Sequence, residues 1–310
     1  MTSFDIVVVG GGMAALTAGL FGARAGRSIL VLEPAVPGGH LVNIARIEDF
    51  PGFPDGVSGY ELGPNTQLQA MNAGAEFAMS EVTGLAQTGD GWLVATADGK
   101  YDAGAVIVAS GSHARTLGLP GEDRFLGRGI SHCASCDAPL FRGQTVGVVG
   151  GGDSALQEAL TLAEHVSKVV LFHRGDSLAA QDVYVQRVLN ERKIEVCRQT
   201  EVRAILGEDE VTGVSVRDLQ TDAERTVDLS ALFVYVGLAP NTDFLGDLLQ
   251  LDGDGRIPTD IWMQTAVPGL FAAGDVRRDS ASQAITAAGD GATAAIAADR
   301  YLRSRAGTAT

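Results

Sequence analysis

Two cysteines separated by two residues are the most reactive feature of this 310-residue sequence: Cys133 and Cys136, in Cys-Ala-Ser-Cys-Asp. At this spacing the two sulfurs can form and break a disulfide with little rearrangement, and a nearby helix N-terminus or cation favours the thiolate. In a reducing compartment a close pair is typical of redox catalysis or of metal binding. The pair therefore indicates one of these two chemistries.

Metal binding is the weaker of the two interpretations. A structural zinc site needs about four ligands. The sequence has no second CxxC, and its five histidines do not assemble into ligand spacing around this one. We therefore expect a redox pair and no metal site. The third cysteine, Cys197, lies in an apolar alternating run and is expected to be a buried strand residue.

Two glycine-rich segments, residues 4–16 and 145–156, predict sites for dinucleotides. Each has a short apolar strand, a GxGxxA turn and a helix start. The first glycine permits the tight turn, the second lets the backbone approach a pyrophosphate, and the alanine lets helix and strand pack closely. Both turns precede a helix N-terminus, which can hold phosphate. The residues in these three roles are Gly10, Gly12 and Ala15 in the first copy, and Gly150, Gly152 and Ala155 in the second.

The strand that follows each copy distinguishes the two nucleotides. After the first, residues 28–33 form an apolar strand that ends at Glu33, where a carboxylate accepts hydrogen bonds from a ribose 2′-OH. After the second, residues 168–175 contain an apolar strand that is followed by a basic residue, Arg174, instead. The sequence therefore predicts two nucleotides of different kinds.

Two more apolar strands lead into small-residue turns. Residues 101–112 end in a turn that contains Gly111, a candidate cofactor contact. Residues 270–276 lead to Asp275, where a carboxylate can hold a ribitol hydroxyl, and then to an alanine-rich helical stretch over 281–303. The alternative role for Asp275 is a helix cap.

Composition and charge exclude other classes of protein. With 45% hydrophobic residues and 40 glycines, the chain suits an α/β enzyme of two domains. Aromatic residues make up only 6%, which argues against stacking on single-stranded nucleic acid. The 23 basic and 38 acidic residues give a formal net charge of −15, so DNA or an anionic membrane surface would be repelled. We expect neither nucleic acid nor membrane as a partner.

The uncharged run from Ile6 to Ala23 is long enough to be mistaken for a membrane span. Three consecutive glycines break it, so a strand, a glycine turn and a helix explain it better. The first residues contain no basic region, so we expect no secretory signal and a cytoplasmic protein.

The order of these motifs resembles the low-molecular-weight thioredoxin reductase family, which belongs to class II of the pyridine nucleotide-disulfide oxidoreductases. The resemblance extends over nearly the whole chain. It also implies cofactor contacts at positions that the patterns alone do not single out. The residues and segments that carry it are 10–15, Glu33, Gly38, Gly39, 133–137, 150–155 and 273–275, followed by Gln283, Ala284, Ile285 and Thr286.

The resemblance implies an α/β fold of two Rossmann-like dinucleotide-binding domains, the second inserted into the first. The FAD-binding domain would comprise residues 1–113 and 241–310, and the NAD(P)H-binding-like domain, which carries the CxxC, residues 114–240. The hinges would lie near 113–115 and 238–241. In the family, rotation of the inserted domain presents the nicotinamide and the cysteine pair to the flavin in turn. The family also implies a homodimer.

Roles for the residues around the cysteines follow from the same resemblance. Cys136 would face the flavin, and Cys133 would exchange with the substrate. Asp137 matches an acidic residue proposed to move a proton as a thiolate leaves, with a helix cap as its alternative role. His132 would stabilise a thiolate or donate a proton, or else be simply solvated.

The sequence departs from the family at two places. NADPH-using members carry two adjacent arginines after the second-domain strand and a third four residues later. Here only Arg174 remains, because Gly175 and Ala179 occupy the other two positions, and the acidic residue typical of NADH users is missing as well. We therefore expect NAD(P)H with only a weak preference for NADPH, or another donor such as ferredoxin.

The second departure concerns the surface on which a disulfide substrate would dock. Ser282 replaces a frequent arginine, and Ala138 and Pro139 replace glycine and an aromatic residue, whereas Arg128 keeps a basic residue ahead of the pair. The expected partner is a thioredoxin-like protein or a small disulfide or dithiol.

Three functional hypotheses remain at this point. In the first, NAD(P)H reduces FAD, FAD reduces the Cys133/Cys136 disulfide, and the dithiol reduces a protein or small-molecule disulfide. In the second, the cycle runs backwards as a dithiol oxidase, with O₂ reoxidising the flavin. In the third, the protein is a flavin-binding redox sensor or structural subunit without turnover.

Overall fold

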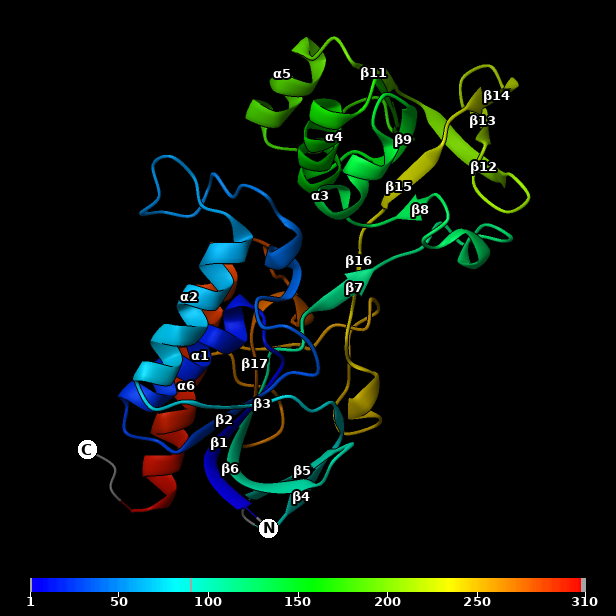
Figure 1. The fold of residues 1–310 in the computed structure, drawn as a ribbon. Coiled ribbons are helices and arrows are strands. Elements are labelled where there is room, and N and C mark those ends of the chain that lie inside the picture. The colour runs from blue at the N-terminus through cyan, green and yellow to red at the C-terminus, as the bar shows by residue number, and fades with distance from the viewer. Residues whose placement is uncertain (1, 90, 308–310) are drawn as a thin grey trace. The chain divides into compact units, whose positions relative to one another are not determined.

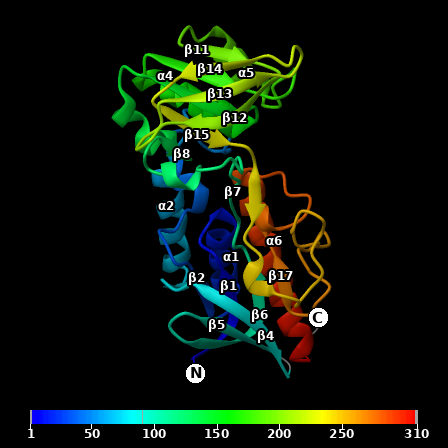
Figure 2. The ribbon, with the colours of Figure 1, turned by 90° about the vertical axis from the view of Figure 1, so that its right-hand side faces the viewer.

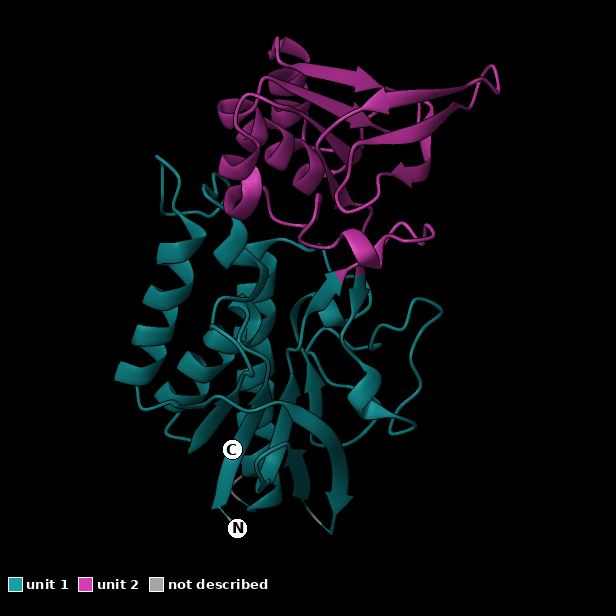
Figure 3. Ribbon diagram, turned by 45° about the vertical axis from the view of Figure 1, so that its right-hand side comes forward, with its two compact units in different colours: residues 1–113, 239–310 teal, residues 114–238 magenta. Residues whose placement is uncertain are grey.

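The computed structural model describes residues 2–89 and 91–307 of the chain, which form two compact units (Figure 3). Unit 1 comprises Met1–His113 and Ala239–Thr310, and unit 2 comprises Ala114–Leu238. Unit 2 is therefore inserted into unit 1. At the two crossings, β7 (Ser112–Ala114) and β16 (Leu238–Pro240) pair with each other.

Unit 1 is built on a twisted, mostly parallel sheet with the strand order β3-β2-β1-β6-β5-β4, in which β17 pairs with β6. The pairs β2–β3, β1–β2, β1–β6 and β6–β17 are parallel, whereas β4, β5 and β6 are joined as antiparallel neighbours. The strands are β1 (Thr2–Val9), β2 (Ile29–Leu32), β3 (Glu76–Ala78), β4 (Val82–Thr88), β5 (Gly91–Thr96), β6 (Lys100–Val108) and β17 (Leu270–Ala272).

Helix α1 (Met13–Arg24) packs between α2 (Gly59–Asn72) and α6 (Ala284–Arg305) on one face of this sheet (Figure 1). Successive side chains of a strand point to opposite faces. Accordingly, Ile6 and Val8 of β1 belong to the core under the helices, and Val7 and Val9 to the core on the other face. Helices α1 and α6 approach so closely that a Cβ on Gly291 would collide with the carbonyl oxygen of Ala14. This contact is available only to glycine.

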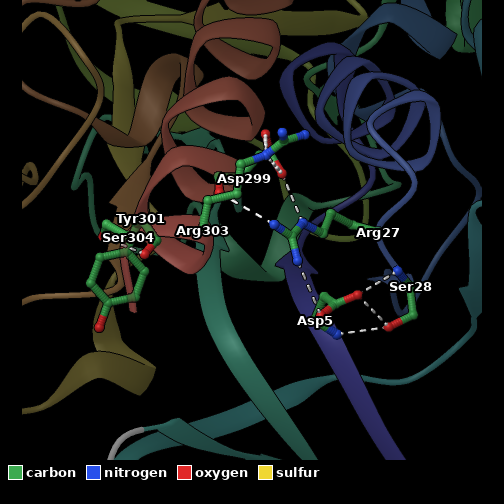
Figure 4. Close-up of polar contacts among 7 residues, drawn as sticks. All are labelled: Asp5, Arg27, Ser28, Asp299, Tyr301, Arg303 and Ser304. Atoms are coloured by element: carbon green, nitrogen blue, oxygen red, sulfur yellow. Dashed lines mark hydrogen bonds and ion pairs between the residues drawn. The ribbon is translucent and has the colours of Figure 1, made fainter. Parts of the chain in front are cut away.

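A polar cluster ties the start of β2, β1 and α6 together within unit 1 (Figure 4). Arg27 donates from Nε to Asp299 Oδ1 at 2.8 Å, and its Nη1 lies 3.7 Å from Asp5 Oδ1. Arg303 donates to the same carboxylate at 2.9 Å. Burial by itself would raise the pKa of Asp299, but the hydrogen bonds from Arg27 and Arg303 outweigh it and hold the pKa below its usual range. Asp299 is therefore ionised and paired.

Unit 2 contains a parallel sheet with the order β11-β10-β9-β15-β8. It also contains a separate antiparallel sheet with the order β12-β13-β14 (Figure 2). Its strands are β8 (Ile130–Ser131), β9 (Thr145–Gly150), β10 (Lys168–Phe172), β11 (Ile194–Cys197), β12 (Thr200–Leu206), β13 (Gly213–Asp218), β14 (Glu224–Asp228) and β15 (Ala231–Tyr235). Its α-helices are α3 (Ala134–Asp137), α4 (Asp153–His165) and α5 (Asp182–Asn190).

The parallel sheet of unit 2 is covered on both faces, as its nearly continuous apolar strands require. On one face, Val148 and Phe233 pack with Leu156 of α4. On the other face, Phe172 and Leu232 pack with the antiparallel sheet. Short 3₁₀ turns complete the chain: η1 (Gly39–Asn43), η2 (Asp123–Phe125), η3 (Ala138–Phe141), η4 (Asp243–Leu245) and η5 (Gly274–Val276).

The run from Ile6 to Ala23 is a strand, a turn and a helix, as predicted. No helix in the described part of the chain has the length and apolarity to cross a membrane. The final helix is shifted from its predicted bounds, since it begins at Ala284 and ends at Arg305. The reason is local: Ser282 has φ +53° and Gln283 is extended, so the backbone becomes helical only after them.

Candidate functional site

The first glycine turn joins β1 to α1 in unit 1. Gly10 has φ +109°, and a Cβ on it would collide with the carbonyl oxygen of Ala109, so the turn requires glycine. Gly12 is the N-cap of α1, and a Cβ there would find no heavy atom within 4 Å. Ala15, in the first turn of α1, is fully buried. The turn therefore leaves open space directly before a helix N-terminus, where a pyrophosphate can accept its N–H groups.

Glu33 follows β2 and lies against this turn. An ideal Cβ on Gly11 would be 2.5 Å from Glu33 Cγ, so the side chain covers the glycine directly. One carboxylate oxygen accepts the N–H of Ala35 at 3.0 Å. This hydrogen bond fixes the side chain where its other oxygen can accept a ribose hydroxyl.

The Gly38-Gly39 pair also lies against the first turn. Gly38 donates its N–H to the carbonyl oxygen of Gly11 at 2.8 Å. Gly39 has φ +58°, and a Cβ on it would be 3.0 Å from the Cα of Gly12. Residues separated in the sequence are thus brought together around one small space.

The parallel strands bring further predicted residues to the same edge of the sheet. Val9 pairs with Leu32 and with Val108, and Val108 pairs with Ala272, so these four strands end side by side. The turns that follow them contain, in turn, Gly10, Glu33, Gly111 and Asp275. Ligands of open parallel sheets bind at the carboxyl ends of the strands.

Asp275 is half-buried in this region, and loss of solvent raises its pKa even though Ser280 donates its hydroxyl to Oδ1 at 3.2 Å. His40 and Arg256 attract the carboxylate and oppose this shift. Arg256 also donates to the backbone oxygen of Asp275 at 2.7 Å. Ser280 and Arg256 therefore hold Asp275 in place, although little water reaches its carboxyl group.

Gly111, Gln283 and Ala284 complete the predicted set in unit 1. Gly111 has φ +64°, and its carbonyl oxygen accepts the N–H of Asn241 at 3.0 Å. Gln283 is the N-cap of α6, and Ala284 begins that helix. The residues of unit 1 fit an FAD because open space, a helix N-terminus and two carboxylates meet at one sheet edge.

The second glycine turn joins β9 to α4 in unit 2 and repeats this geometry. Gly150 has φ +155°, and a Cβ on it would be 2.6 Å from the carbonyl oxygen of Tyr235. Gly152 is the N-cap of α4, and its nearest neighbour to a Cβ would be the carbonyl oxygen of Ala179 at 4.0 Å. Ala155 is buried. The same open space before a helix N-terminus fits the pyrophosphate of a pyridine nucleotide.

Arg174 follows β10, and its side chain is exposed. The preceding His173 lies against the glycine turn, and its Nε2 donates to the carbonyl oxygen of Ser177 at 2.9 Å. Ala179 is exposed and donates its N–H to the carbonyl oxygen of Gly151 at 2.7 Å. The loop that would meet a 2′-phosphate is thus tethered to the turn that would hold the pyrophosphate.

The cysteine pair lies at the start of α3 in unit 2. Cys133 and Cys136 are joined in a disulfide. Cys133 is the N-cap of α3, and its Sγ accepts the N–H of Cys136 at 3.2 Å. Cys133 is half-buried and Cys136 is exposed. A hydrogen bond from a backbone N–H stabilises negative charge, so this geometry favours a thiolate at Cys133 when the disulfide opens.

His132 and Asp137 flank the pair. His132 Nδ1 lies 3.0 Å from the carbonyl oxygen of Val234. A carbonyl can only accept, so Nδ1 donates and Nε2 is the nitrogen that can take a proton. Asp137 ends α3, and its N–H donates to the carbonyl oxygen of Cys133 at 3.2 Å. It also occupies the N-cap position of η3, where its side chain makes no capping hydrogen bond.

A buried carboxyl group beneath the pair is not among the predicted site residues. Glu158 of α4 accepts the N–H of Ala134 at 2.9 Å, and the hydroxyl of Tyr235 donates to the same oxygen at 3.4 Å. Glu158 is only 9% exposed. The sequence carries a signal for it, because positions 155, 158, 159 and 162 form one helix face whose other members are apolar and buried.

Cys197 ends β11 as a buried strand residue, as expected. Burial raises the pKa of its thiol, and so does the nearby Glu195 carboxylate. The thiol is therefore inert compared with the pair. Within the described ranges, no cluster of three histidine, cysteine or acidic side chains could hold a metal ion.

Comparison with known proteins identifies the family. Residues 4–291 match the family described as pyridine nucleotide-disulphide oxidoreductase. The chain is also 41% identical to a thioredoxin reductase from Treponema pallidum over 301 residues, which are 97% of this chain and 98% of that protein. The chain belongs to the pyridine nucleotide-disulphide oxidoreductase family.

Further members of the family support the same placement. A thioredoxin reductase from Streptomyces clavuligerus is 42% identical, with 96% of this chain and 94% of that protein covered. The crystal structure of Lactococcus lactis thioredoxin reductase matches with a TM-score of 0.95 at 38% identity, covering 97% of this chain and 99% of the other. The predicted family and the fold of two Rossmann-like domains are thereby confirmed. The protein is an FAD-dependent, thioredoxin reductase-like disulfide oxidoreductase.

Proposed function

We propose that Cys133 and Cys136 are the redox pair through which this oxidoreductase reduces a thioredoxin-like protein or a small disulfide in the cytoplasm. The observation that carries the proposal is their disulfide at the start of α3, with an N–H donor aimed at Cys133 and with Cys136 exposed. A disulfide that serves stability gains most from closing a long loop of the unfolded chain, whereas Cys133 and Cys136 are only three residues apart. We further propose that the protein acts as a homodimer, by resemblance to the family.

In this proposal the electrons come from two cofactors, each bound in its own unit. Unit 1 would hold FAD with Gly10, Gly12 and Ala15 at the pyrophosphate, Glu33 at the adenosine ribose, and Asp275 at the ribitol. The supporting contacts would come from Gly38, Gly39, Gly111, Gln283 and Ala284. When bound, FAD would accept a hydride from the pyridine nucleotide and pass the electron pair to the disulfide. Unit 2 would hold the pyridine nucleotide with Gly150, Gly152, Ala155 and Arg174.

The protein's own residues carry out the exchange with the substrate. The Cys133 thiolate attacks one sulfur of the substrate disulfide, forming a mixed disulfide and releasing the other substrate sulfur as a thiolate. Cys136 then attacks Cys133 Sγ, which restores the internal disulfide and releases the second substrate thiolate. Asp137 and Nε2 of His132 are the proposed proton donors and acceptors for these sulfurs. Arg128, exposed ahead of the pair, would contact an acidic partner surface.

The test is the anaerobic reaction of the flavin with the cysteine pair in single variants of the FAD-loaded protein. Cys136→Ser should abolish electron exchange between the flavin and the pair. Cys133→Ser leaves a thiolate beside the flavin and should show long-wavelength charge-transfer absorbance. Cys197→Ser is the matched control and should turn over as the parent does, because its thiol is buried outside the pair. Full disulfide turnover in both Cys133→Ser and Cys136→Ser would refute the proposal.

A further inference from the structure

Glu158 is a carboxyl group in a position where the fold otherwise packs apolar side chains. It lies on α4 one turn after Ala155, and its neighbours on the same helix face, Ala159 and Leu162, are fully buried. An isolated buried carboxylate is costly, so such groups are hydrogen-bonded or lose their charge. The contacts of Glu158 therefore decide whether its carboxyl group is charged or neutral.

Apart from the hydroxyl of Tyr235 on β15, those contacts are with the cysteine turn. Glu158 Oε2 accepts the N–H of Ala134 at 2.9 Å, and the carboxyl group also accepts the N–H of Ser135. These are the first amides of α3, which no intrahelical carbonyl can satisfy. Glu158 thus holds the residues between the two cysteines from beneath.

The sulfur and the carboxyl group share this short turn. The next amide, of Cys136, donates to Cys133 Sγ at 3.2 Å. Consecutive N–H groups of one turn therefore serve Glu158 and Cys133. A charge on either group acts on the other through the same small, partly desolvated volume.

In the oxidised protein Glu158 is close to the midpoint between its charged and neutral forms at neutral pH. Burial raises its pKa to about 7, and the amides of Ala134 and Ser135 and the hydroxyl of Tyr235 lower it without cancelling the effect. The other titratable groups around it are Tyr235 on β15, whose own pKa is raised by burial and by Glu158, and Asp137 on α3, which acts on Tyr235. His132, before the pair, is engaged through Nδ1 with Val234. A second negative charge nearby would shift this balance toward the neutral acid.

We propose that Glu158 is a positioning residue for the redox pair, which holds the cysteine turn through its amides and takes up a proton when the Cys133–Cys136 disulfide is reduced. The inference rests on the proposed redox role of that pair. On reduction the S–S bond breaks and the two sulfurs accept an electron pair from the reduced flavin. One sulfur takes a proton and becomes a thiol, the other remains a thiolate, and the Glu158 carboxylate takes a second proton from solvent. Oxidation reverses each step and releases both protons.

The direct test is infrared difference spectroscopy of the FAD-loaded protein at about pH 8, before and after reduction with excess dithiothreitol. At this pH the oxidised protein has Glu158 mostly ionised, since a group with a pKa near 7 is about tenfold more ionised than protonated one unit higher. The parent should gain the carbonyl stretch of a protonated carboxylic acid, which shifts in D₂O. Glu158→Gln should lack this band, and subtraction of its spectrum cancels the carbonyl bands of the flavin. Glu164→Gln, the same change at an exposed position of the same helix, should keep it.

A redox titration of the pair gives a second readout. Alkylation of Cys133 and Cys136 at fixed dithiothreitol ratios yields the midpoint potential at each pH. One proton taken up per electron pair changes the equilibrium constant tenfold per pH unit, or about 30 mV. Near pH 8, Glu158→Gln should lose close to one proton from this dependence, and Glu164→Gln should lose none. Near pH 7 the loss in Glu158→Gln should fall to about half a proton, because a group with a pKa of about 7 is already half protonated there in the oxidised protein. Equal slopes in all three proteins, or a parent spectrum with no new band, would overturn the inference.

Two features keep these outcomes decisive. If Glu158→Gln does not fold, Tyr235→Phe serves instead: removal of the hydroxyl raises the pKa of Glu158 in the oxidised state, so the band gained on reduction at pH 8 should shrink. Dithiothreitol reduces the cysteines directly and alkylation reports it. Failure of electron exchange between flavin and pair would therefore refute the proposed function without affecting the measurement on Glu158.

Discussion

Introduction of one arginine at Ala179 should convert the weak preference for NADPH that we predict into a clear one. Ala179 is exposed, and its N–H donates to the carbonyl oxygen of Gly151 at 2.7 Å. Its own carbonyl oxygen lies 4.0 Å from where a Cβ on Gly152 would be. A side chain at 179 thus starts beside the turn proposed to hold the pyrophosphate, on the same loop as Arg174.

The magnitude follows from the hydrogen bonds that the sequence lacks. A charge-assisted hydrogen bond from arginine to a 2′-phosphate is worth about 1.5 to 3 kcal/mol. Two missing arginines should cost roughly 3 to 6 kcal/mol of discrimination if they add, which is about a hundredfold to ten-thousandfold in relative affinity. Ala179→Arg restores one of them and should raise the NADPH-to-NADH ratio by about tenfold to 150-fold.

Gly175→Arg should gain less than Ala179→Arg. A Cβ at Gly175 would be 2.6 Å from Nε2 of His173, the atom that donates to the Ser177 carbonyl oxygen. The histidine ring would have to move and lose this hydrogen bond before an arginine could fit. The structure therefore ranks the two positions, which the sequence alone treats as equivalent.

The assay is stopped-flow bleaching of the flavin by NADPH and by NADH under anaerobic conditions. Ala179→Gln controls for side-chain length without charge, and Arg174→Gln should bring the ratio close to one. A parent preference for NADPH above about a thousandfold would show that unrecognised basic residues replace the missing arginines. An unchanged ratio in Ala179→Arg would show that the 2′-phosphate does not reach this loop.

Two further predictions test the cofactor sites and the stability of unit 1. A Cβ would find no heavy atom within 4 Å at Gly12 and only the carbonyl oxygen of Ala179, at 4.0 Å, at Gly152, so neither valine would clash with the protein itself. Gly12→Val should therefore lose FAD while keeping pyridine nucleotide binding, and Gly152→Val should do the reverse. Flavin absorbance and nucleotide titration check each variant, and loss of both ligands in either one would contradict the assignment. Arg27→Met removes the principal partner of the Asp299 carboxylate, which is 13% exposed, and should lower the free energy of unfolding at pH 7 by about 1 to 3 kcal/mol, with exposed Arg24→Met as the control. Because the folded pKa of Asp299 is depressed, the stability that its ion pair contributes is complete above about pH 4 and is lost as the pH falls through the folded pKa. The difference in the free energy of urea unfolding between Arg27→Met and the parent should therefore shrink below about pH 4. A difference that stays constant with pH would exclude the ion pair as its cause.

Local sequence patterns predicted much of the candidate site, because the residues that form a dinucleotide site lie within short segments of the chain. A GxGxxA turn between an apolar strand and a helix depends on residues adjacent in the chain, and Gly10 and Gly150 both adopt the positive φ that such turns require. The CxxC likewise brings its two sulfurs together within one turn. These features could be predicted because the residues that matter are neighbours in the sequence.

Long-range arrangement could not be predicted in the same way. Gly38 and Gly39 were expected at the cofactor only through the family resemblance, and it is the fold that brings Gly38 to the carbonyl oxygen of Gly11. The inert environment of Cys197, with Arg225 donating to its sulfur at 3.5 Å, likewise depends on strands distant in the chain. Packing between separate elements, rather than spacing, decides these contacts.

Glu158 shows most clearly what the sequence predicts and what depends on tertiary packing. The sequence by itself determined that a charged residue falls on the apolar face of the helix after the second glycine turn, since that follows from helical periodicity alone. Only the tertiary structure decided what lies opposite: the amides of Ala134 and Ser135 from the cysteine turn and the hydroxyl of Tyr235 from β15. The physical reason is that a pKa depends on desolvation and on partners within a few ångströms, and those are set when the elements pack, whichever order they have along the chain.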